Sequence, residues 1–248
     1  MKFEAVDEFV AEAGYTPFTS PAAGKMLYEF VLNSGVRDLL ELGFAQGTST
    51  VYMAAALQER GEGLVTTIDR ATALERKPNL PELARALALE EYVRPIVVEN
   101  TYTWELMRLI ERQTERGETV PCFDFCFFDG AHTWETDGLA FFLVDKLLRH
   151  DRWVLFDDLH WTQASSPLLT EEKAGRVPTE ELETPQMKQV FDLLVRQHAD
   201  YVDFRVLGNY GWAYKADPSG GGHSDDLEAL SGETIFDLAF GAVRARSE

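Results

Sequence analysis

Basic residues are scarce in this sequence, which has 23 Lys and Arg against 42 Asp and Glu and a net charge of −19. Proteins bind nucleic acid largely by neutralising phosphates with Lys and Arg, so a charge of this sign opposes nucleic-acid binding. It also opposes adsorption to an anionic membrane surface. Small neutral or cationic substrates, and divalent metal ions, remain open as ligands.

Long apolar runs are lacking as well, and no window approaches the roughly 20 apolar residues that span a bilayer. The first residues are acidic where a secretory signal would be basic and then apolar. The two cysteines, Cys122 and Cys126, fit small buried hydrophobic side chains in a reducing compartment. We therefore expect a cytoplasmic protein, and the 45% apolar content suffices for one well-buried domain.

Apolar strand-like and amphipathic helix-like segments alternate along the chain. The expected strands are residues 36–43, 63–69, 93–99, 123–129 and 153–158, and the expected helices between them are residues 51–59, 80–89, 102–116 and 133–149. Strands separated by helices pair in parallel through right-handed crossovers. A further helix is expected over 185–197, and after it two strands, 201–207 and 211–215, flank a Gly208-Asn209 turn typical of an antiparallel hairpin. The sequence predicts an α/β, Rossmann-like, doubly wound and mostly parallel seven-stranded sheet with a final antiparallel hairpin.

The segments outside this alternation suggest a division of the chain. Residues 1–34 form N-terminal helices on the substrate side or at an oligomer contact, and residues 35–216 form the cofactor-binding domain. Within that domain, residues 159–181 are polar and too long for a passive connection, so we expect an insert or lid. Residues 217–248 are a linker and a C-terminal helix at 233–244. The terminal helices offer surfaces for a homo-oligomer.

A third glycine is missing from the loop that follows the first strand. The loop carries Gly43 and Gly47, with Ala45 where a dinucleotide-binding loop usually has its middle glycine. Asp69 ends the second strand, where an acid can accept both ribose hydroxyls of an adenosine. The pattern predicts an adenosine-type cofactor, and an ordinary tight turn is the alternative. Glu41 and the missing glycine favour S-adenosylmethionine over NAD.

An Asp-x-x-His pattern follows both of the next two strands. Asp129 and His132 follow one strand, and Asp157, Asp158 and His160 follow the other. If these strands are neighbours, three carboxylates and two imidazoles share one edge of the sheet. Carboxylates so close raise one another's pKa unless a cation or strong donors hold them, and oxygen ligands suit Mg²⁺, Ca²⁺ or Mn²⁺. The alternative is that one Asp caps the following helix and one His is a surface group.

Over about Gly35–Lys215 the sequence resembles the class I S-adenosylmethionine-dependent methyltransferases. ELGFAQGTST is similar to the family's glycine-loop motif, and TIDR to the acidic strand end that holds the ribose. FFDGAHTWETDGLAFFLVDKLL and WVLFDDLHW resemble the branch of macrocin-type sugar O-methyltransferases, in which a DGAH-like segment and a DD pair bind Mg²⁺.

The resemblance implies a role for each matching residue. The residues implied to surround the methionine part of the cofactor are Glu41, Gly43, Gln46, Gly47 and Thr48. Asp69 is implied to bind the ribose and Asn100 the adenine. Asp129 is implied to serve the cofactor and the reaction, and with Asp157 and Asp158 to bind a metal ion. His132, or failing that His160, is implied to be the general base, since imidazole exchanges a proton near neutral pH.

The expected function is O-methylation of a small hydroxylated acceptor, a sugar or a specialised metabolite. S-adenosyl-L-methionine is the expected cofactor, and Mg²⁺ is a conditional second one. The expected partner is a small-molecule substrate, with no nucleic acid and no membrane. N-methylation stays open because an amine needs less activation than a hydroxyl. The sequence is also compatible with an NAD(P)-dependent oxidoreductase and with a non-catalytic cofactor-binding protein.

Overall fold

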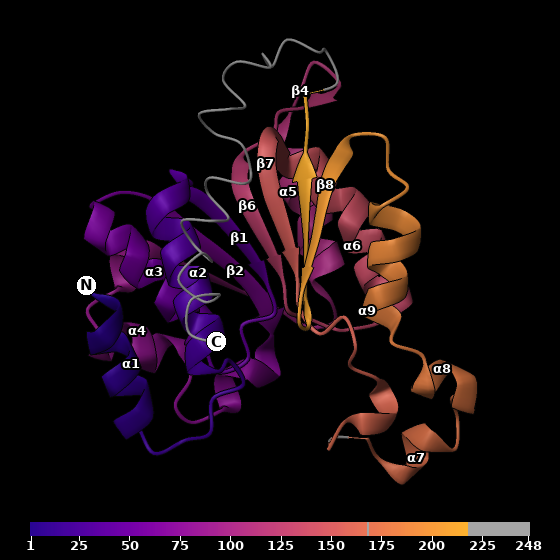
Figure 1. Cartoon of the computed structure of the whole chain (residues 1–248), viewed down its shortest axis with the longest axis horizontal. Coiled ribbons are helices and arrows are strands. Elements are labelled where there is room, and N and C mark those ends of the chain that lie inside the picture. The colour runs from indigo at the N-terminus through magenta and orange to yellow at the C-terminus, as the bar shows by residue number, and fades with distance from the viewer. Residues whose placement is uncertain (168, 218–248) are drawn as a thin grey trace, which may run out of the picture. The chain divides into compact units, whose positions relative to one another are not determined.

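The structure is a computed structural model of the chain, and it describes residues 1–167 and 169–217 (Figure 1). The strands in these residues are β1 (Asp38–Leu42), β2 (Leu64–Arg70), β3 (Val93–Val98), β4 (Thr114–Glu115), β5 (Glu118–Thr119), β6 (Phe123–Phe128), β7 (Leu148–Phe156), β8 (Tyr201–Leu207) and β9 (Tyr210–Lys215). Each strand of the predicted sheet is present, with ends that differ from the expected ones by a few residues.

Seven strands form one sheet in the order β3-β2-β1-β6-β7-β9-β8. β2 pairs in parallel with β1 and β3, and β6 pairs in parallel with β7. β9 runs antiparallel to β7 and to β8. The predicted fold class is therefore confirmed, including the final antiparallel hairpin. Pro95 lies on β3, an outer strand, which suits a residue without a backbone N–H.

The chain divides into two compact units, of which the first contains Met1–Asn100 and the second Thr101–Ala216. Helices of the first unit are α1 (Phe3–Glu12), α2 (Pro21–Ser34), α3 (Thr48–Arg60) and α4 (Leu80–Ala86), with 3₁₀ turns η1 (Ala71–Glu75) and η2 (Glu90–Tyr92). α3 is the central helix of this unit, because every residue from Thr48 to Leu57 is buried.

The helix ends of the first unit follow from local sequence signals. α2 begins at Pro21 after Ser20, whose Oγ accepts the N–H of Ala23, and it ends before Gly35 in the left-handed region. α4 begins with a capping box, in which the Asn79 and Glu82 side chains each accept the other's backbone N–H. These signals fix where the loop before β1 begins and where the loop before α4 ends.

Helices of the second unit are α5 (Tyr102–Gln113), α6 (Trp134–Leu147), η3 (Gln163–Ser165), α7 (Glu171–Ala174), α8 (Thr179–Glu183), α9 (Gln186–Gln189) and the π-helical η4 (Val190–Val195). α5 packs against α6, and α6 packs against η4. Figure 1 shows α7 and α8 lying apart from the strands of this unit. The predicted insert 159–181 thus contains short helices, and its role as a lid stays a prediction.

Three predicted elements of the second unit differ from the structure. The helix expected to reach residue 116 ends at Gln113, and β4 and β5 form a hairpin around Gly117, which has a φ of 89°. The helix expected over 185–197 starts as α9 and continues as a π-helix. β7 starts at Leu148, before the expected 153, and its pairing with β6 shifts register after Phe123.

No helix in the described residues is both long enough and apolar enough to cross a membrane. The predicted C-terminal helix at 233–244 lies outside the described residues. An oligomer contact through the terminal helices stays a prediction.

Candidate active site

The glycine loop of the first unit joins β1 to α3 and is held by its own backbone. Gly43 donates its N–H to the Ile68 carbonyl at 2.9 Å, and Gly47 donates to the Phe44 carbonyl at 2.5 Å. Gly47 has a φ of 98°, and a Cβ at this position would lie 2.6 Å from Leu80 Cδ1. Position 47 therefore requires glycine both for its conformation and for its close approach to α4.

Glu41 is fully buried beneath this loop. Its Oε1 accepts the Ser49 hydroxyl at 2.6 Å, and its Oε2 accepts the hydroxyls of Thr50 at 2.5 Å and Thr67 at 2.6 Å. Burial raises the pKa of Glu41 to about 7, against the lowering effect of the three hydroxyl donors. The side chain has no exposed surface. Glu41 thus ties β1, β2 and the first turn of α3 together.

Asp69, at the end of β2, holds the glycine loop from the other side. Its Oδ2 accepts the backbone N–H groups of Phe44 at 2.9 Å and Ala45 at 2.8 Å, and its Oδ1 accepts that of Arg70 at 2.6 Å. The residue remains partly exposed. An anionic acceptor is thereby fixed at a strand end beside the loop, where the sequence predicted an acid for a ribose.

The remaining predicted cofactor residues of this unit have different surroundings. Thr48 Oγ1 hydrogen-bonds with the Tyr15 hydroxyl at 2.9 Å, and Gln46 Nε2 donates to the Thr16 carbonyl at 3.5 Å. Asn100 is exposed beyond the end of β3. The segment after α1 therefore reaches the glycine loop. The sequence carries no signal for this contact, because Tyr15 lies in no recognisable motif.

In the second unit, the loop after β6 carries Asp129 and His132. Nε2 of His132 lies 3.4 Å from Asp158 Oδ2 and 3.9 Å from Asp129 Oδ1. Nδ1 of the same ring is buried and makes no hydrogen bond within the described part of the chain. His132 has a φ of 55°, in the left-handed region. The structure thus brings together three of the predicted residues, with one imidazole nitrogen unpaired.

Tyr102 and Asp137 anchor this loop from α5 and α6. The Tyr102 hydroxyl accepts the Ala131 N–H at 3.1 Å and donates to Asp137 Oδ1, whose other oxygen accepts the Thr133 N–H at 2.8 Å. The ring of Tyr102 also packs on Gly130, where a Cβ would lie 2.5 Å from it. The anchor holds the backbone on both sides of His132.

Asp157 and Asp158 follow β7 and adopt a constrained turn. Asp157 Oδ1 accepts the Asp158 N–H at 2.6 Å, and Asp158 has a φ of 57°. Burial, followed by the negative charge of Asp158, raises the pKa of Asp157 to about 7. The turn therefore concentrates acceptor oxygens and negative charge near His132.

Residues that sequence reasoning missed complete this group. Asn209 Nδ2 donates to Asp158 Oδ1 at 2.7 Å, and its Oδ1 accepts the backbone N–H of His160 at 2.8 Å. Burial and the charges of Asp157, Asp129 and Asp158 raise the pKa of Tyr210, so its hydroxyl stays neutral. The sequence places Asn209 and Tyr210 only in a hairpin, and their contacts depend on long-range pairing of β9 with β7.

His132 and His160, the two predicted bases, differ in environment. The His132 ring lies 5.3 Å from the Trp161 ring and is largely buried. His160 is exposed. Of the two, His132 is the one that lies within 3.9 Å of the carboxylates of Asp129 and Asp158.

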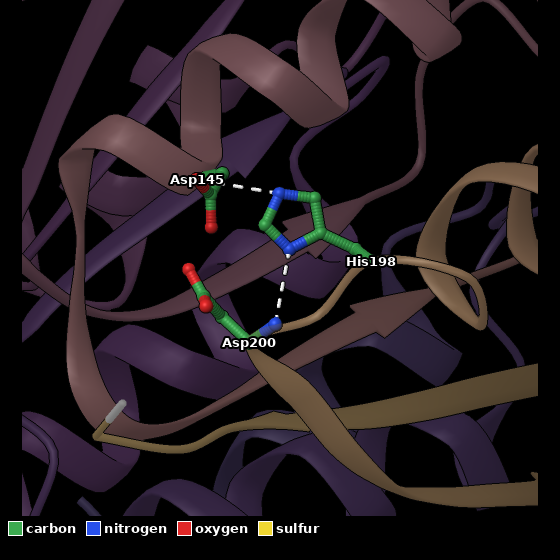
Figure 2. Close-up of side chains that lie close together, drawn as sticks. All are labelled: Asp145, His198 and Asp200. Atoms are coloured by element: carbon green, nitrogen blue, oxygen red, sulfur yellow. Dashed lines mark hydrogen bonds and ion pairs between the residues drawn. The ribbon is translucent and has the colours of Figure 1, made fainter. Parts of the chain in front are cut away.

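A second cluster of metal-ligating side chains lies elsewhere in this unit (Figure 2). Ligand atoms of Asp145, His198 and Asp200 lie within 4.8 Å of one another; among described residues, the predicted set of Asp129, Asp157 and Asp158 does not form such a group. His198 Nδ1 accepts the Asp200 N–H at 3.3 Å, so the ring proton is on Nε2, which faces Asp145 at 3.9 Å. Lys215 Nζ lies 3.0 Å from Asp145 Oδ1.

These contacts describe a structural network rather than a metal centre. A metal ion needs the Nε2 lone pair of His198, which the proton occupies in this tautomer. The buried Lys215 ammonium already balances the charge of Asp145. The cluster ties α6 to the start of β8 and the end of β9.

Residues 40–159 match the sequence profile of a family described as "Methyltransferase domain". The match runs from β1 to the end of the Asp157–Asp158 turn, and so includes every predicted site residue except His160. No curated protein sequence matches the chain significantly.

Solved structures of methyltransferases have the same fold. An O-methyltransferase from Bacillus cereus in complex with SAH has 20% identity and a TM-score of 0.56, covering 86% of this chain and 90% of its own. TomG from Streptomyces achromogenes, an O-methyltransferase of tomaymycin synthesis in complex with SAM, has 16% identity and a TM-score of 0.56, with coverages of 87% and 89%. MycE from the mycinamycin biosynthetic pathway, in complex with Mg and SAH, has 16% identity and a TM-score of 0.52, with coverages of 88% and 56%.

Proposed function

We propose that the protein methylates a hydroxyl of a small molecule with S-adenosylmethionine, because residues 40–159 match a methyltransferase-domain family. The surroundings of His132 are the observation that supports a hydroxyl acceptor. Its imidazole faces two carboxylates, and its second nitrogen makes no hydrogen bond within the described residues. A hydroxyl needs a base to become a good nucleophile, whereas an amine needs less help. The family match favours methyl transfer over hydride transfer.

The reaction on this proposal is a single displacement. The acceptor oxygen forms a bond to the methyl carbon while the bond from that carbon to the sulfonium breaks, leaving S-adenosylhomocysteine. His132 takes the hydroxyl proton, and Asp129 and Asp158 stabilise the imidazolium that forms. Tyr102 and Asp137 keep the loop in place, since they hold the backbone on both sides of the base.

The first unit supplies the cofactor-binding residues. Asp69 is proposed to accept hydrogen bonds from the ribose, with Gly43, Gln46, Gly47 and Thr48 around the methionine part and Asn100 at the adenine. Glu41 is proposed as a positioning residue, because it has no exposed surface and acts through the loop that it anchors. The solved relatives bound to SAM or SAH support this choice of cofactor.

Replacing Asp69 with asparagine is expected to weaken binding of S-adenosylhomocysteine by about tenfold or more. The exchange removes the charge and one acceptor, and a hydrogen bond to a charged group contributes about 1.5–3 kcal/mol. Titration calorimetry measures the affinity. Glu75→Gln removes an exposed charge from the same unit and is the matched control. An unchanged affinity in Asp69→Asn would contradict the ribose assignment.

Asp129, Asp157 and Asp158 supply carboxylate oxygens, the ligand type that a hard divalent cation prefers. Their ligand atoms do not all lie within 4.8 Å of one another, so binding one ion would draw the three side chains together. Burial, followed by the negative charge of Asp158, raises the pKa of Asp157, and a bound cation would offset that charge. A cation held by these residues would lower the pKa of the acceptor hydroxyl. We propose Mg²⁺ in this role, in addition to the proton transfer to His132.

Removal of divalent metal tests this part of the proposal. We expect dialysis against EDTA to lower turnover at least about tenfold, with recovery on addition of Mg²⁺. The double variant Asp157→Asn/Asp158→Asn should be slow in both conditions and should bind no Mg²⁺ in calorimetry. Asp151→Asn, an exposed acid on the same strand, is the control. Equal turnover with and without EDTA would leave His132 as the sole activating group.

The location and the auxiliary segments are also proposals. We propose the cytoplasm, because the chain has only two cysteines, Cys122 and Cys126, which fit small apolar side chains in a reducing compartment. Residues 159–181 are proposed as a lid and residues 1–34 as a substrate-side or oligomer-contact segment. Residues 35–216 are proposed as the cofactor-binding domain. The partner is proposed to be a small molecule rather than nucleic acid or membrane, as the acidic charge favours.

A further inference from the structure

A surface pocket of about 480 Å³ lies in the second unit beside the first turn of α6. Its walls come from α6, α8, α9 and η4, and they include Trp134, Glu135, Glu180, Glu181, Gln186 and Leu193. Pockets that hold small ligands commonly have volumes of about 300–1,000 Å³. The pocket is therefore large enough for a small organic molecule or for one end of a larger one.

A buried amide holds two walls of this pocket in a fixed relation. Gln186 Oε1 accepts the backbone N–H of Trp134 at 2.7 Å, and Gln186 Nε2 donates to the Glu181 carbonyl at 3.0 Å. Gln186 is only 5% exposed. One side chain thus links the start of α6 to the end of α8, so the pocket is a built feature and not a gap between loose segments.

The lining has charge of one sign. Glu135, Glu180 and Glu181 contribute three carboxylates, and no Lys or Arg lines the pocket. None of the three makes an ion pair with another residue whose placement is described. Carboxylates without a protein cation attract a cationic ligand and repel an anionic one.

The aromatic side chain of Trp134, in the pocket wall, also favours a cationic ligand. The Trp134 side chain is 38% exposed, and it lines the pocket together with the carboxylates. The face of an indole ring attracts an ammonium group and also packs on the apolar body of a ligand. Charge and aromatic surface therefore select a protonated amine attached to an apolar or ring-shaped body.

The pocket begins where the loop of the proposed base ends. Trp134 is two residues beyond His132, a span of at most about 7 Å along the backbone. Gln186 holds the Trp134 backbone at this point, so the loop of the proposed base leads directly into a wall of the pocket. The pocket and the proposed base therefore belong to the same unit and lie next to each other along the chain.

We propose that this pocket binds the methyl acceptor, and that the acceptor is a hydroxylated compound with a protonated amine. The inference rests on the proposed function for the methyl transfer, but the binding preference follows from the pocket alone. The amine is held by Glu180, Glu181 and Glu135 over Trp134, and the hydroxyl faces His132.

Two catechols of opposite charge test the preference. Dopamine carries an ammonium group, and 3,4-dihydroxyphenylacetate carries a carboxylate on a similar body. We expect calorimetry to give at least about tenfold tighter binding of dopamine. The variant Glu180→Gln/Glu181→Gln should weaken dopamine binding about tenfold, and Glu90→Gln/Glu91→Gln, an exposed pair on η2, should leave it unchanged. Binding of S-adenosylhomocysteine should be the same in both variants.

The outcomes separate this inference from the proposed function. Equal affinity for the two catechols, or an equal loss in the η2 variant, would overturn the pocket inference even if methyl transfer is found. Dopamine binding that depends on Glu180 and Glu181 supports the inference, even in a protein that binds no S-adenosylhomocysteine. In that last case the methyltransferase proposal fails and the cation-binding pocket stands.

Discussion

Replacing His132 with asparagine is expected to lower kcat by about 10²–10⁴-fold, the usual contribution of a positioned general base. Asparagine tolerates the left-handed backbone that His132 adopts, with a φ of 55°, so the loop should keep its shape. Its amide cannot accept the acceptor proton. Binding of S-adenosylhomocysteine should be unchanged, because His132 acts on the acceptor.

The measurement is the rate of S-adenosylhomocysteine formation at saturating acceptor, with binding followed separately by calorimetry. His160→Asn is the matched control, since His160 belongs to the second Asp-x-x-His pattern but is exposed. We expect this control to stay within about twofold of the parent. A larger loss in His160→Asn than in His132→Asn would reverse the assignment of the base.

The fold could be predicted because the spacing of the apolar residues and the turn residues between them indicate the same helices and strands along most of the chain. Five apolar strands separated by helices allow little besides a parallel sheet, because such strands pair through crossover connections. β4 and β5 were missed because two-residue strands have no readable alternation. The π-helix η4 was missed because a pattern of apolar residues does not distinguish it from an α-helix.

Part of the site was also predictable, for a topological reason. β6 and β7 are neighbours, so Asp129, His132 and Asp158 meet at the ends of two adjacent strands. Asn209 and Tyr210 could not be predicted in the same way, because their places depend on how β9 pairs with β7. Local sequence describes a hairpin turn, but it does not say which strand the hairpin lies against.

Glu41 illustrates a different limit of sequence reasoning. An acid before a glycine loop suggests a contact with the cofactor, yet hydroxyls from Ser49, Thr50 and Thr67 occupy both of its oxygens. Ser49 and Thr50 lie in the first turn of α3, where polar residues usually serve as helix caps, and Thr67 comes from β2. The partnership among these side chains exists only once β1, β2 and α3 are packed together.

The burial of Glu41 should make stability depend on pH, and Glu41→Gln should remove that dependence. The pKa of Glu41 rises from its ordinary 4.5 to about 7 on folding, because burial disfavours the charged form. The contribution of Glu41 to the free energy of unfolding is fully present below pH 4.5, where the side chain is protonated in both the native and the unfolded state. It is lost as the pH rises through 7, because the native protein must then hold a buried charge.

The difference of about 2.5 pH units between 4.5 and 7 corresponds to about 3 kcal/mol of unfolding free energy. Urea denaturation at pH 4.5, 6 and 8 measures it. Relative to the parent, Glu41→Gln should gain about 3 kcal/mol between the first and the last of these pH values. The raised pKa of Asp157 is common to both proteins, so its effect cancels in the comparison. Glu75→Gln, at an exposed position of the same unit, should follow the parent at every pH.

The slope of this difference distinguishes two physical accounts of the site. If burial dominates, the gain of Glu41→Gln increases with pH. If instead the three hydroxyl donors stabilise the carboxylate more than burial disfavours it, the pKa of Glu41 is lowered. The glutamine variant then becomes less stable relative to the parent as the pH rises. A slope of that opposite sign would mean that the loop anchor is built on a charged Glu41. A rising slope means that the anchor is a neutral carboxyl group at the pH where the loop is most stable.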